Sequence, residues 1–187
     1  MFNLILLGAP GSGKGTQSKL LINKLGFLQI STGDILRKEV ADNSDLGKMA
    51  NKIMQSGNLV PDDIMIDMMR NHISQIDYSK GLIFDGFPRN IEQAKHLDQL
   101  LAEYDACVNK VILLDIPTQM LVDRIIHRYT CKNCGAIYNK KFKIEKIAGV
   151  CDGCGGKEFI QRDDDNAETI KNRIDIFNNL TAMLKTY

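Results

Sequence analysis

Long apolar runs are missing from this 187-residue sequence, and none approaches the roughly 20 residues that cross a membrane as a helix. A basic N-terminal signal region is also missing, because Met1-Phe2-Asn3 leads directly into an apolar segment. The net charge is only +1, which argues against broad attraction to nucleic acid or to a membrane surface. We therefore expect a cytoplasmic protein with no nucleic-acid or membrane partner. We also expect a monomer.

Internal repeats and low-complexity tracts are absent too, so the chain is expected to fold around one core that carries insertions. Apolar runs of strand length at 2–7, 28–30, 81–85 and 108–115 alternate with segments of helical pattern. Those segments lie at 17–25, 31–41, 45–55, 61–76, 91–104, 117–127 and 164–185. This alternation predicts an α/β fold with a parallel sheet covered by helices on both faces. The run Val111-Ile112-Leu113-Leu114 is expected to be buried on both faces.

A glycine-rich segment, Gly8-Ala9-Pro10-Gly11-Ser12-Gly13-Lys14-Gly15-Thr16, separates the first strand from the first helix. Strand, glycine-rich loop and helix form the context that a phosphate-binding loop requires. The glycines allow backbone N–H groups to converge on an anion, and the helix N-terminus adds its positive dipole end. Lys14 would reach the terminal phosphates as a point charge. The alternative is a flexible turn that happens to contain a lysine.

Asp85 ends an apolar strand and is followed by Gly86-Phe87-Pro88-Arg89. Parallel sheets bind ligands beyond the carboxyl ends of their strands, so Asp85 and the glycine-rich segment are expected to lie close together. A carboxylate beside bound phosphates can hold Mg²⁺ or its water ligands. The alternative is an aspartate that only caps the turn after the strand.

Four cysteines form two Cys-x-x-Cys pairs, Cys131 with Cys134 and Cys151 with Cys154. Two thiolate pairs at this separation close a tetrahedral zinc site. All four ligands would come from the protein, which leaves no open position for a substrate and indicates a structural metal. Disulfides are not expected in a cytoplasmic protein, and an iron–sulfur centre is the minor alternative.

The glycine-rich segment, spelled Gly-x-Pro-Gly-x-Gly-Lys-Gly-Thr, resembles the adenylate kinase family and its nucleoside monophosphate kinase relatives. Gly15 stands where other phosphate-binding loops carry Ser or Thr. Three further motifs look like adenylate kinase motifs in the family's order: Ser-Thr-Gly-Asp-x-x-Arg at 31–37, Asp-Gly-Phe-Pro-Arg at 85–89 with Gln93, and Arg-x-Asp-Asp at 162–165. The match covers nearly the whole chain. It implies a P-loop NTPase-like core that converts ATP and AMP to two ADP.

The resemblance also implies a division of the chain and a set of cofactors. The core would comprise 1–30, 61–126 and 165–187, the AMP-binding segment 31–60, and a zinc-bearing lid 127–164. Mg²⁺ would accompany ATP, held through water by Asp85, and Zn²⁺ would be structural, as in the lid of some bacterial adenylate kinases. Family members usually continue past the equivalent of Tyr187 with a strand and a helix. A chain without them is expected to have an open adenine pocket, weak discrimination between ATP and GTP, and an exposed apolar sheet edge.

Individual roles follow from the same resemblance. ATP would be bound by Arg124 and by the loop residues Gly11, Ser12, Gly13, Lys14, Gly15 and Thr16. AMP would be bound by Thr32, Arg37, Gly57, Val60, Gly86, Arg89 and Gln93. Thr32 favours AMP, because relatives acting on UMP or CMP usually carry Ala there. The catalytic set would be Lys14 with Arg128, Arg162 and Arg173, oriented by Asp164 and Asp165.

No histidine in the sequence has convincing partners for general-base catalysis. This fits an acceptor phosphate that is already anionic. The second pKa of a phosphate monoester lies near 6. Three rival readings are another nucleoside monophosphate kinase, a module that binds adenine nucleotides without turnover, and a zinc ribbon for nucleic acid. Retention of every expected charged group argues against the second, and the balanced charge with few aromatics argues against the third.

Overall fold

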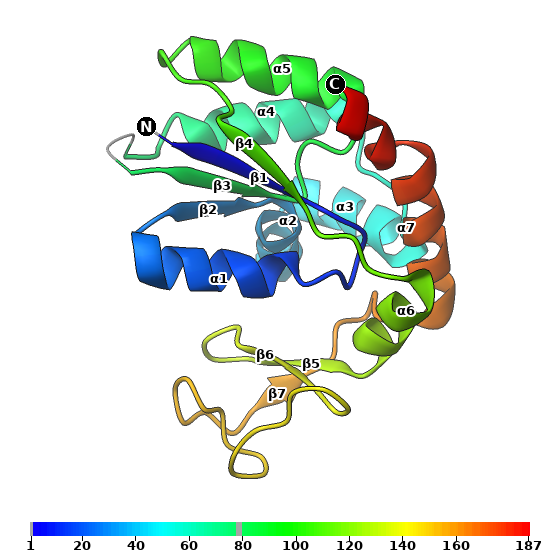
Figure 1. Cartoon of the computed structure of the whole chain (residues 1–187). Helices are drawn as coiled ribbons and strands as arrows, with labels where there is room; N and C mark the ends of the chain where they lie inside the picture. The colour runs from blue at the N-terminus through cyan, green and yellow to red at the C-terminus, as the bar shows by residue number, and fades with distance from the viewer. Residues whose placement is uncertain (1, 78–79) are drawn as a thin grey trace.

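A four-stranded parallel sheet forms the centre of the computed structural model, which describes residues 2–77 and 80–187 (Figure 1). Its order is β2-β3-β1-β4, and the strands are β1 (Asn3–Leu7), β2 (Leu28–Ser31), β3 (Leu82–Asp85) and β4 (Lys110–Leu113). Leu6 pairs with Asp85, and Ser31 pairs with Asp85 from the other side. The register therefore brings the ends of three strands together, where the loops that follow them meet.

Seven α-helices and one 3₁₀ helix are found in the described part of the chain. They are α1 (Lys14–Leu25), α2 (Thr32–Ala41), α3 (Asp45–Ser56), α4 (Asp62–Ile73), α5 (Ile91–Ala102), α6 (Thr118–Ile126), α7 (Ala167–Asn179) and η1 (Thr181–Thr186). None of these helices is long and apolar enough to cross a membrane.

Alternating side chains of the strands face two different apolar clusters, as expected for strands with a period of two. Ile5, Ile30 and Phe84 pack with α2, α3, α4 and α5 in the largest cluster. Leu4 and Ile83 pack on the opposite face with side chains of α1. Helices thus cover both faces of the sheet, and the predicted fold class is confirmed (Figure 1).

The prediction for the fourth strand was wrong in part. The strand is shorter than 108–115, and Val111 and Ile112 are 52% and 44% exposed rather than buried on both faces. β4 is last in the strand order and pairs with β1 alone, while α1 packs against β1, β2 and β3. An apolar run predicts a strand, but its burial depends on which helices reach it.

The end of the chain also differs from the predicted helix at 164–185. Asn166 caps α7 by accepting a hydrogen bond from the backbone N–H of Thr169, so the helix begins only at Ala167. It ends at Asn179, and η1 follows as a separate 3₁₀ helix. Tyr187 then donates a hydrogen bond to Asp98 of α5 over 2.8 Å, which anchors the end of the chain on the core.

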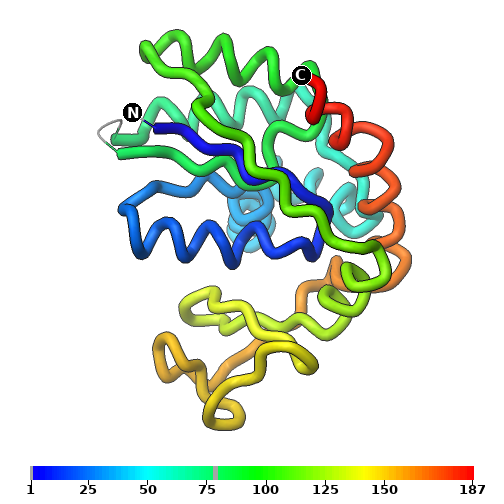
Figure 2. The backbone as a smooth tube through the Cα atoms, viewed as in Figure 1, coloured from blue at the N-terminus to red at the C-terminus, as the bar shows by residue number. Residues whose placement is uncertain are grey.

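Residues 127–164, which are predicted to form a lid and are called the lid below, project from the rest of the chain as a lobe (Figure 2). This lobe contains a small antiparallel sheet. Its strands are β5 (Arg128–Cys131), β6 (Ile137–Asn139) and β7 (Phe159–Ile160), in the order β6-β5-β7. Tyr138 is buried in its centre, with the rings of Tyr129 and Phe159 against it at 5.7 and 5.6 Å between centroids. The lid follows α6 and leads into α7, and Ala9 of the glycine-rich loop packs with Leu121 of α6 and Ile170 of α7.

Candidate active site

A cavity of about 790 Å³ lies where the strand ends, the glycine-rich loop and the lid meet. Most of the predicted nucleotide-binding residues line it: Gly11, Gly13, Lys14, Gly15, Thr16, Thr32, Arg37, Gly57, Val60, Asp85, Gly86, Arg89, Gln93, Arg124, Arg128, Arg162 and Arg173. The predicted residues Ser12, Asp164 and Asp165 are buried and are not part of the lining that the structure describes. The tertiary structure therefore brings distant motifs to one site.

The glycine-rich loop turns sharply before α1. Gly11 and Gly13 have φ values of 82° and 104°, in the left-handed region that favours glycine. A Cβ at Gly11 would also lie only 2.9 Å from Ile125, so α6 packs directly on the loop. The N-terminus of α1 therefore begins at residues that line the cavity, and a helix N-terminus stabilises an anion.

Lys14 is the cation of this loop. Its ammonium donates to the carbonyls of Gly8 and Ala9, over 2.7 and 3.1 Å. Burial lowers the pKa of Lys14 from 10.5 to about 8, although the nearby charge of Asp85 opposes the shift. A charged lysine held only by carbonyls in this way is suited to a more anionic partner such as a phosphate.

Asp85 lies beside the loop at the end of β3. Gln29 donates to its Oδ2 over 3.0 Å, and a Cβ added to Gly15 would lie 3.7 Å from the same oxygen. Burial raises the pKa of Asp85, and the charge of Lys14 acts against that rise. A carboxylate at the mouth of a phosphate loop is the hard oxygen donor that Mg²⁺ prefers, so the residues fit the predicted cofactor.

A second group of residues surrounds the carbonyl of Gly86. Thr32 donates to it from Oγ1 over 3.0 Å, and Arg89 donates from Nε over 2.9 Å. Burial together with the charge of Arg173 lowers the pKa of Arg89 to about 10. Arg37, on α2, forms an ion pair with Asp34 at the rim. The arginines predicted for AMP therefore lie on one side of the cavity.

Two buried aspartates pair with two further arginines of the cavity. Arg128 forms a bidentate pair with Asp165, with Nε donating to Oδ2 over 2.8 Å. Arg173 pairs with Asp164 over 2.6 Å. Burial alone would raise the pKa of Asp164, but the charge and hydrogen bond of Arg173, together with the charges of Arg37 and Arg162, lower it. Asp164 and Asp165 are buried outside the described cavity lining, and each forms an ion pair with an arginine that lines it.

Arg162 and Arg124 complete the basic lining. Burial lowers the pKa of Arg162 to about 10, and the nearby charges of Arg128 and Arg37 add to the effect. Its guanidinium lies 4.0 Å from Asp34, so a residue of the lid reaches α2. Arg124 lies on α6, and its carbonyl accepts a hydrogen bond from Asn139 of β6 over 2.8 Å. That contact fixes the lid to the core helix.

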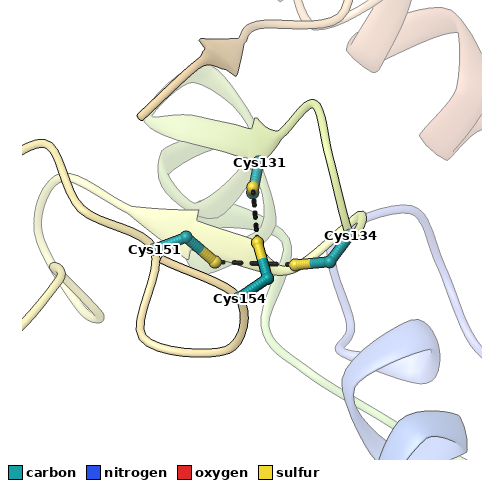
Figure 3. A group of neighbouring side chains, drawn as sticks. All are labelled: Cys131, Cys134, Cys151 and Cys154. Atoms are coloured by element: carbon teal, nitrogen blue, oxygen red, sulfur yellow. Dashed lines mark hydrogen bonds between the residues drawn. The ribbon is translucent and has the colours of Figure 1, made fainter. Parts of the chain in front are cut away.

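The four predicted metal ligands of the lid point toward one centre (Figure 3). Their sulfurs all lie within 4.8 Å of one another, with 3.7 Å from Cys131 to Cys154 and 3.5 Å from Cys134 to Cys151. A tetrahedral zinc with Zn–S bonds of about 2.3 Å places its sulfurs about 3.8 Å apart. The four thiols therefore fit a structural zinc ion.

Tyr138 connects this cluster to the aromatic centre of the lid. Its hydroxyl donates to the sulfur of Cys151 over 3.4 Å and accepts a hydrogen bond from the N–H of Asp152 over 2.7 Å. The bond from Tyr138 lowers the pKa of Cys151 to about 6, which favours the thiolate that a metal needs.

Two residues outside the predicted set contribute to the site. Lys19 of α1 donates from Nζ to the carbonyl of Gly135, which joins the core to the zinc-binding turn. Asp62 accepts hydrogen bonds from Asn90 and Gln93. In the sequence, Asp62 is only an acid in the first turn of a helix, and Lys19 is one lysine on an exposed helix. No local pattern indicates either contact.

Known proteins were compared with the chain as a whole. The adenylate kinase family model matches residues 6–187. An adenylate kinase from Paramagnetospirillum magneticum is 47% identical over 99% of this chain and 85% of its own length. One from Thermodesulfovibrio yellowstonii is 47% identical over 98% and 85%, and one from Lactobacillus delbrueckii subsp. bulgaricus is 43% identical over 100% and 86%. The motifs, the cavity and these similarities together show that the chain belongs to the adenylate kinase family.

Proposed function

We propose that this chain transfers the terminal phosphoryl group of ATP to AMP, reversibly, to give two ADP in the cavity described above. One observation carries the proposal: Lys14 and the arginines at 89, 128, 162 and 173 converge on one cavity beside a phosphate-binding loop. Two anionic substrates repel each other, and a basic enclosure offsets that repulsion. Phosphoryl transfer is catalysed mainly by positioning and by preorganised charge.

ATP would occupy the side of the cavity formed by the glycine-rich loop. Backbone N–H groups of residues 11–16 would surround its phosphates, Lys14 would reach the terminal ones, and Arg124 would lie over the base. Asp85 would hold Mg²⁺ through water, and the ion supplies further neutralisation of phosphate charge. The short distance between Asp85 and Gly15 supports this arrangement.

AMP would occupy the side formed by α2, the end of α3 and the start of α5. Arg37 and Arg89 would bind its phosphate, and Gln93 would contact its base. Thr32, Gly57, Val60 and Gly86 would form the walls. Gly57 has a φ of 77°, and a Cβ there would lie 2.8 Å from the carbonyl of Thr169, so this wall requires glycine.

The transferring phosphoryl group would lie between Lys14, Arg128, Arg162 and Arg173. The acceptor phosphate needs no base, because its second ionisation is largely complete at neutral pH. The work of the protein is therefore to hold three guanidinium groups in place while charge moves between oxygens. Asp164 and Asp165 would perform this positioning through their ion pairs.

Water must be excluded during transfer, since it would otherwise accept the phosphoryl group. We infer that the lid 127–164 and the AMP-binding segment 31–60 close over a core of residues 1–30, 61–126 and 165–187. The contact of Lys19 with Gly135 and the approach of Arg162 to Asp34 support this division. In both, a residue of one segment reaches another across the cavity.

Zinc would be the structural metal of the lid, and magnesium would arrive with ATP. A cytoplasmic location is proposed because four clustered thiols need a reducing compartment to remain ligands. A monomer is proposed because one chain supplies every group that the reaction described here requires.

The proposal is tested by initial rates of ADP formation from ATP with AMP, CMP, UMP or GMP as the acceptor. We expect AMP to give the highest kcat/KM. Faster turnover of CMP or UMP would identify a different nucleoside monophosphate kinase. Tight binding of ATP and AMP without formation of ADP would identify a binding module.

A further inference from the structure

Asp62, the first residue of α4, lies beneath the wall of the AMP side of the cavity. Gln93 of α5 donates from Nε2 to Asp62 Oδ1 over 2.6 Å. Asn90 donates to both carboxylate oxygens, over 3.1 and 2.9 Å. The carboxylate therefore accepts from two amide groups at the start of α5, those of the N-cap residue Asn90 and of Gln93.

The other end of the Gln93 amide is also held. Its Oε1 accepts a hydrogen bond from the backbone N–H of Arg89 over 2.8 Å. Gln93 is only 1% exposed, yet it lines the cavity. Water therefore has little access to Gln93 and does not readily replace either of its two hydrogen bonds.

These two partners leave only one orientation for the amide. A carboxylate can only accept hydrogen bonds, and a backbone N–H can only donate one. A flipped Gln93 would set its oxygen against Asp62 and its NH₂ group against the N–H of Arg89. Buried polar groups that face like partners are costly because nothing compensates them.

We propose that Asp62 determines which purine the acceptor site takes, by fixing the direction of the Gln93 amide. This inference rests on the proposed function, in which Gln93 contacts the base of AMP. In the fixed orientation, Nε2 has one hydrogen left to donate and Oε1 has one lone pair left to accept. This pair matches a 6-aminopurine, whose N1 accepts and whose 6-amino group donates. It opposes a 6-oxopurine, whose N1–H donates and whose O6 accepts.

A purely structural role for Asp62 is the competing explanation, because Asn90 also caps α5 by accepting from the N–H of Gln93 over 2.8 Å. Loss of that cap would change stability and affect every acceptor alike. The ratio of kcat/KM for AMP to kcat/KM for IMP distinguishes the two roles. These nucleotides differ only in the 6-amino or 6-oxo group and the accompanying N1 hydrogen.

The experiment compares this AMP-to-IMP ratio in the wild-type protein, Asp62→Asn and Asp63→Asn. Asp63 is the matched control: it is exposed, lies in the same helical turn, and accepts only from the N–H of Ile64 among the bonds described. We expect Asp62→Asn to lower the ratio about tenfold, mainly through KM, because one buried hydrogen bond no longer has a fixed direction. Asp63→Asn should leave the ratio unchanged. An unchanged ratio in folded Asp62→Asn, or an equal fall in both variants, would overturn the inference.

Gln93→Ala separates this inference from the proposed function. It should raise KM for AMP and bring the ratio close to one. If KM for AMP does not change, the role of Gln93 in the proposed function fails. If Gln93→Ala changes it and Asp62→Asn does not, only the role of Asp62 fails. Should Asp62→Asn not fold, Asp62→Ser gives the same test, and an unchanged ratio there again contradicts the inference.

Discussion

The core and the lid of this protein are stabilised by different means. The core packs buried apolar side chains from three strands and four helices into one large cluster, and it places charged groups around a cavity at the edge of that cluster. The buried cluster of the lid consists of Tyr138 and two of the four cysteines. A segment this small cannot bury enough apolar surface to fold alone. The lid therefore has four clustered thiols that fit a metal where the core has an extensive apolar cluster, and we expect metal binding to supply the stability that apolar packing supplies in the core.

The largest expected effect is unfolding of the lid, but not of the core, when the metal is lost. Cys131→Ser should release the zinc and unfold the lid, because metal binding and folding are coupled in small metal sites. The core should retain its own cooperative unfolding. Elemental analysis and thermal unfolding measure the two effects together, and we expect about one zinc per wild-type chain.

Cys107→Ser is the matched control, since Cys107 is exposed and stands outside the cluster. It should change neither metal content nor the unfolding temperature. Retention of zinc by Cys131→Ser, or iron in the wild-type protein, would refute the assignment of the lid.

The second prediction concerns the core, where one substitution should remove activity but leave the structure intact. Lys14→Met should lower kcat by about a hundredfold, equivalent to ~3 kcal/mol of transition-state stabilisation. The fold should remain, because the loop is shaped by its backbone and glycines rather than by this side chain. Circular dichroism checks the fold and a coupled assay checks the rate. Near-normal activity would mean that the loop does not bind the reacting phosphates.

A third prediction concerns the buried ammonium group of Lys14 in the core. The pKa of Lys14 is about 8 in the folded protein and 10.5 ordinarily. Between these values the unfolded chain binds more protons, so stability should rise as pH increases through this window. Anionic phosphates favour the charged lysine, so nucleotide binding near pH 9 should take up close to one proton. Calorimetry of ATP binding in buffers of different ionisation enthalpy measures this uptake.

Lys14→Met provides the control for that measurement and should abolish the uptake. Binding at pH 7 should be nearly free of proton uptake, because the lysine is then already charged. Equal uptake in the variant and in the wild type would assign the proton to another group.

The smallest expected effect lies within the lid. Tyr138→Phe removes the hydroxyl that donates to Cys151 but keeps the ring between Tyr129 and Phe159. We expect zinc to bind more weakly, by about 1 kcal/mol or roughly fivefold, because a hydrogen bond to a ligand sulfur is lost. Competition with a chelator measures the change. Unchanged affinity would show that the four thiolates alone determine binding.

Local sequence patterns determined much of this protein. A strand, a glycine-rich loop and a helix predicted the phosphate site, and the two Cys-x-x-Cys pairs predicted the thiol cluster. The four sulfurs do cluster, and the loop does lie between a strand and a helix, because each pattern depends on residues close together in the chain, whose backbone conformations the glycines permit. Phosphate binding by the loop stays a prediction.

The tertiary structure decided what depends on neighbours distant in the chain. Val111 and Ile112 form the predicted strand, but their exposure follows from the place of β4 at the end of the strand order. In the sequence, Asp62 is an ordinary acidic residue in the first turn of a helix. Its hydrogen bonds with Asn90 and Gln93 arise only because the start of α5 lies against it. Hydrogen bonds and burial depend on distance in space, and sequence spacing specifies that distance only within a turn, a helix or a loop.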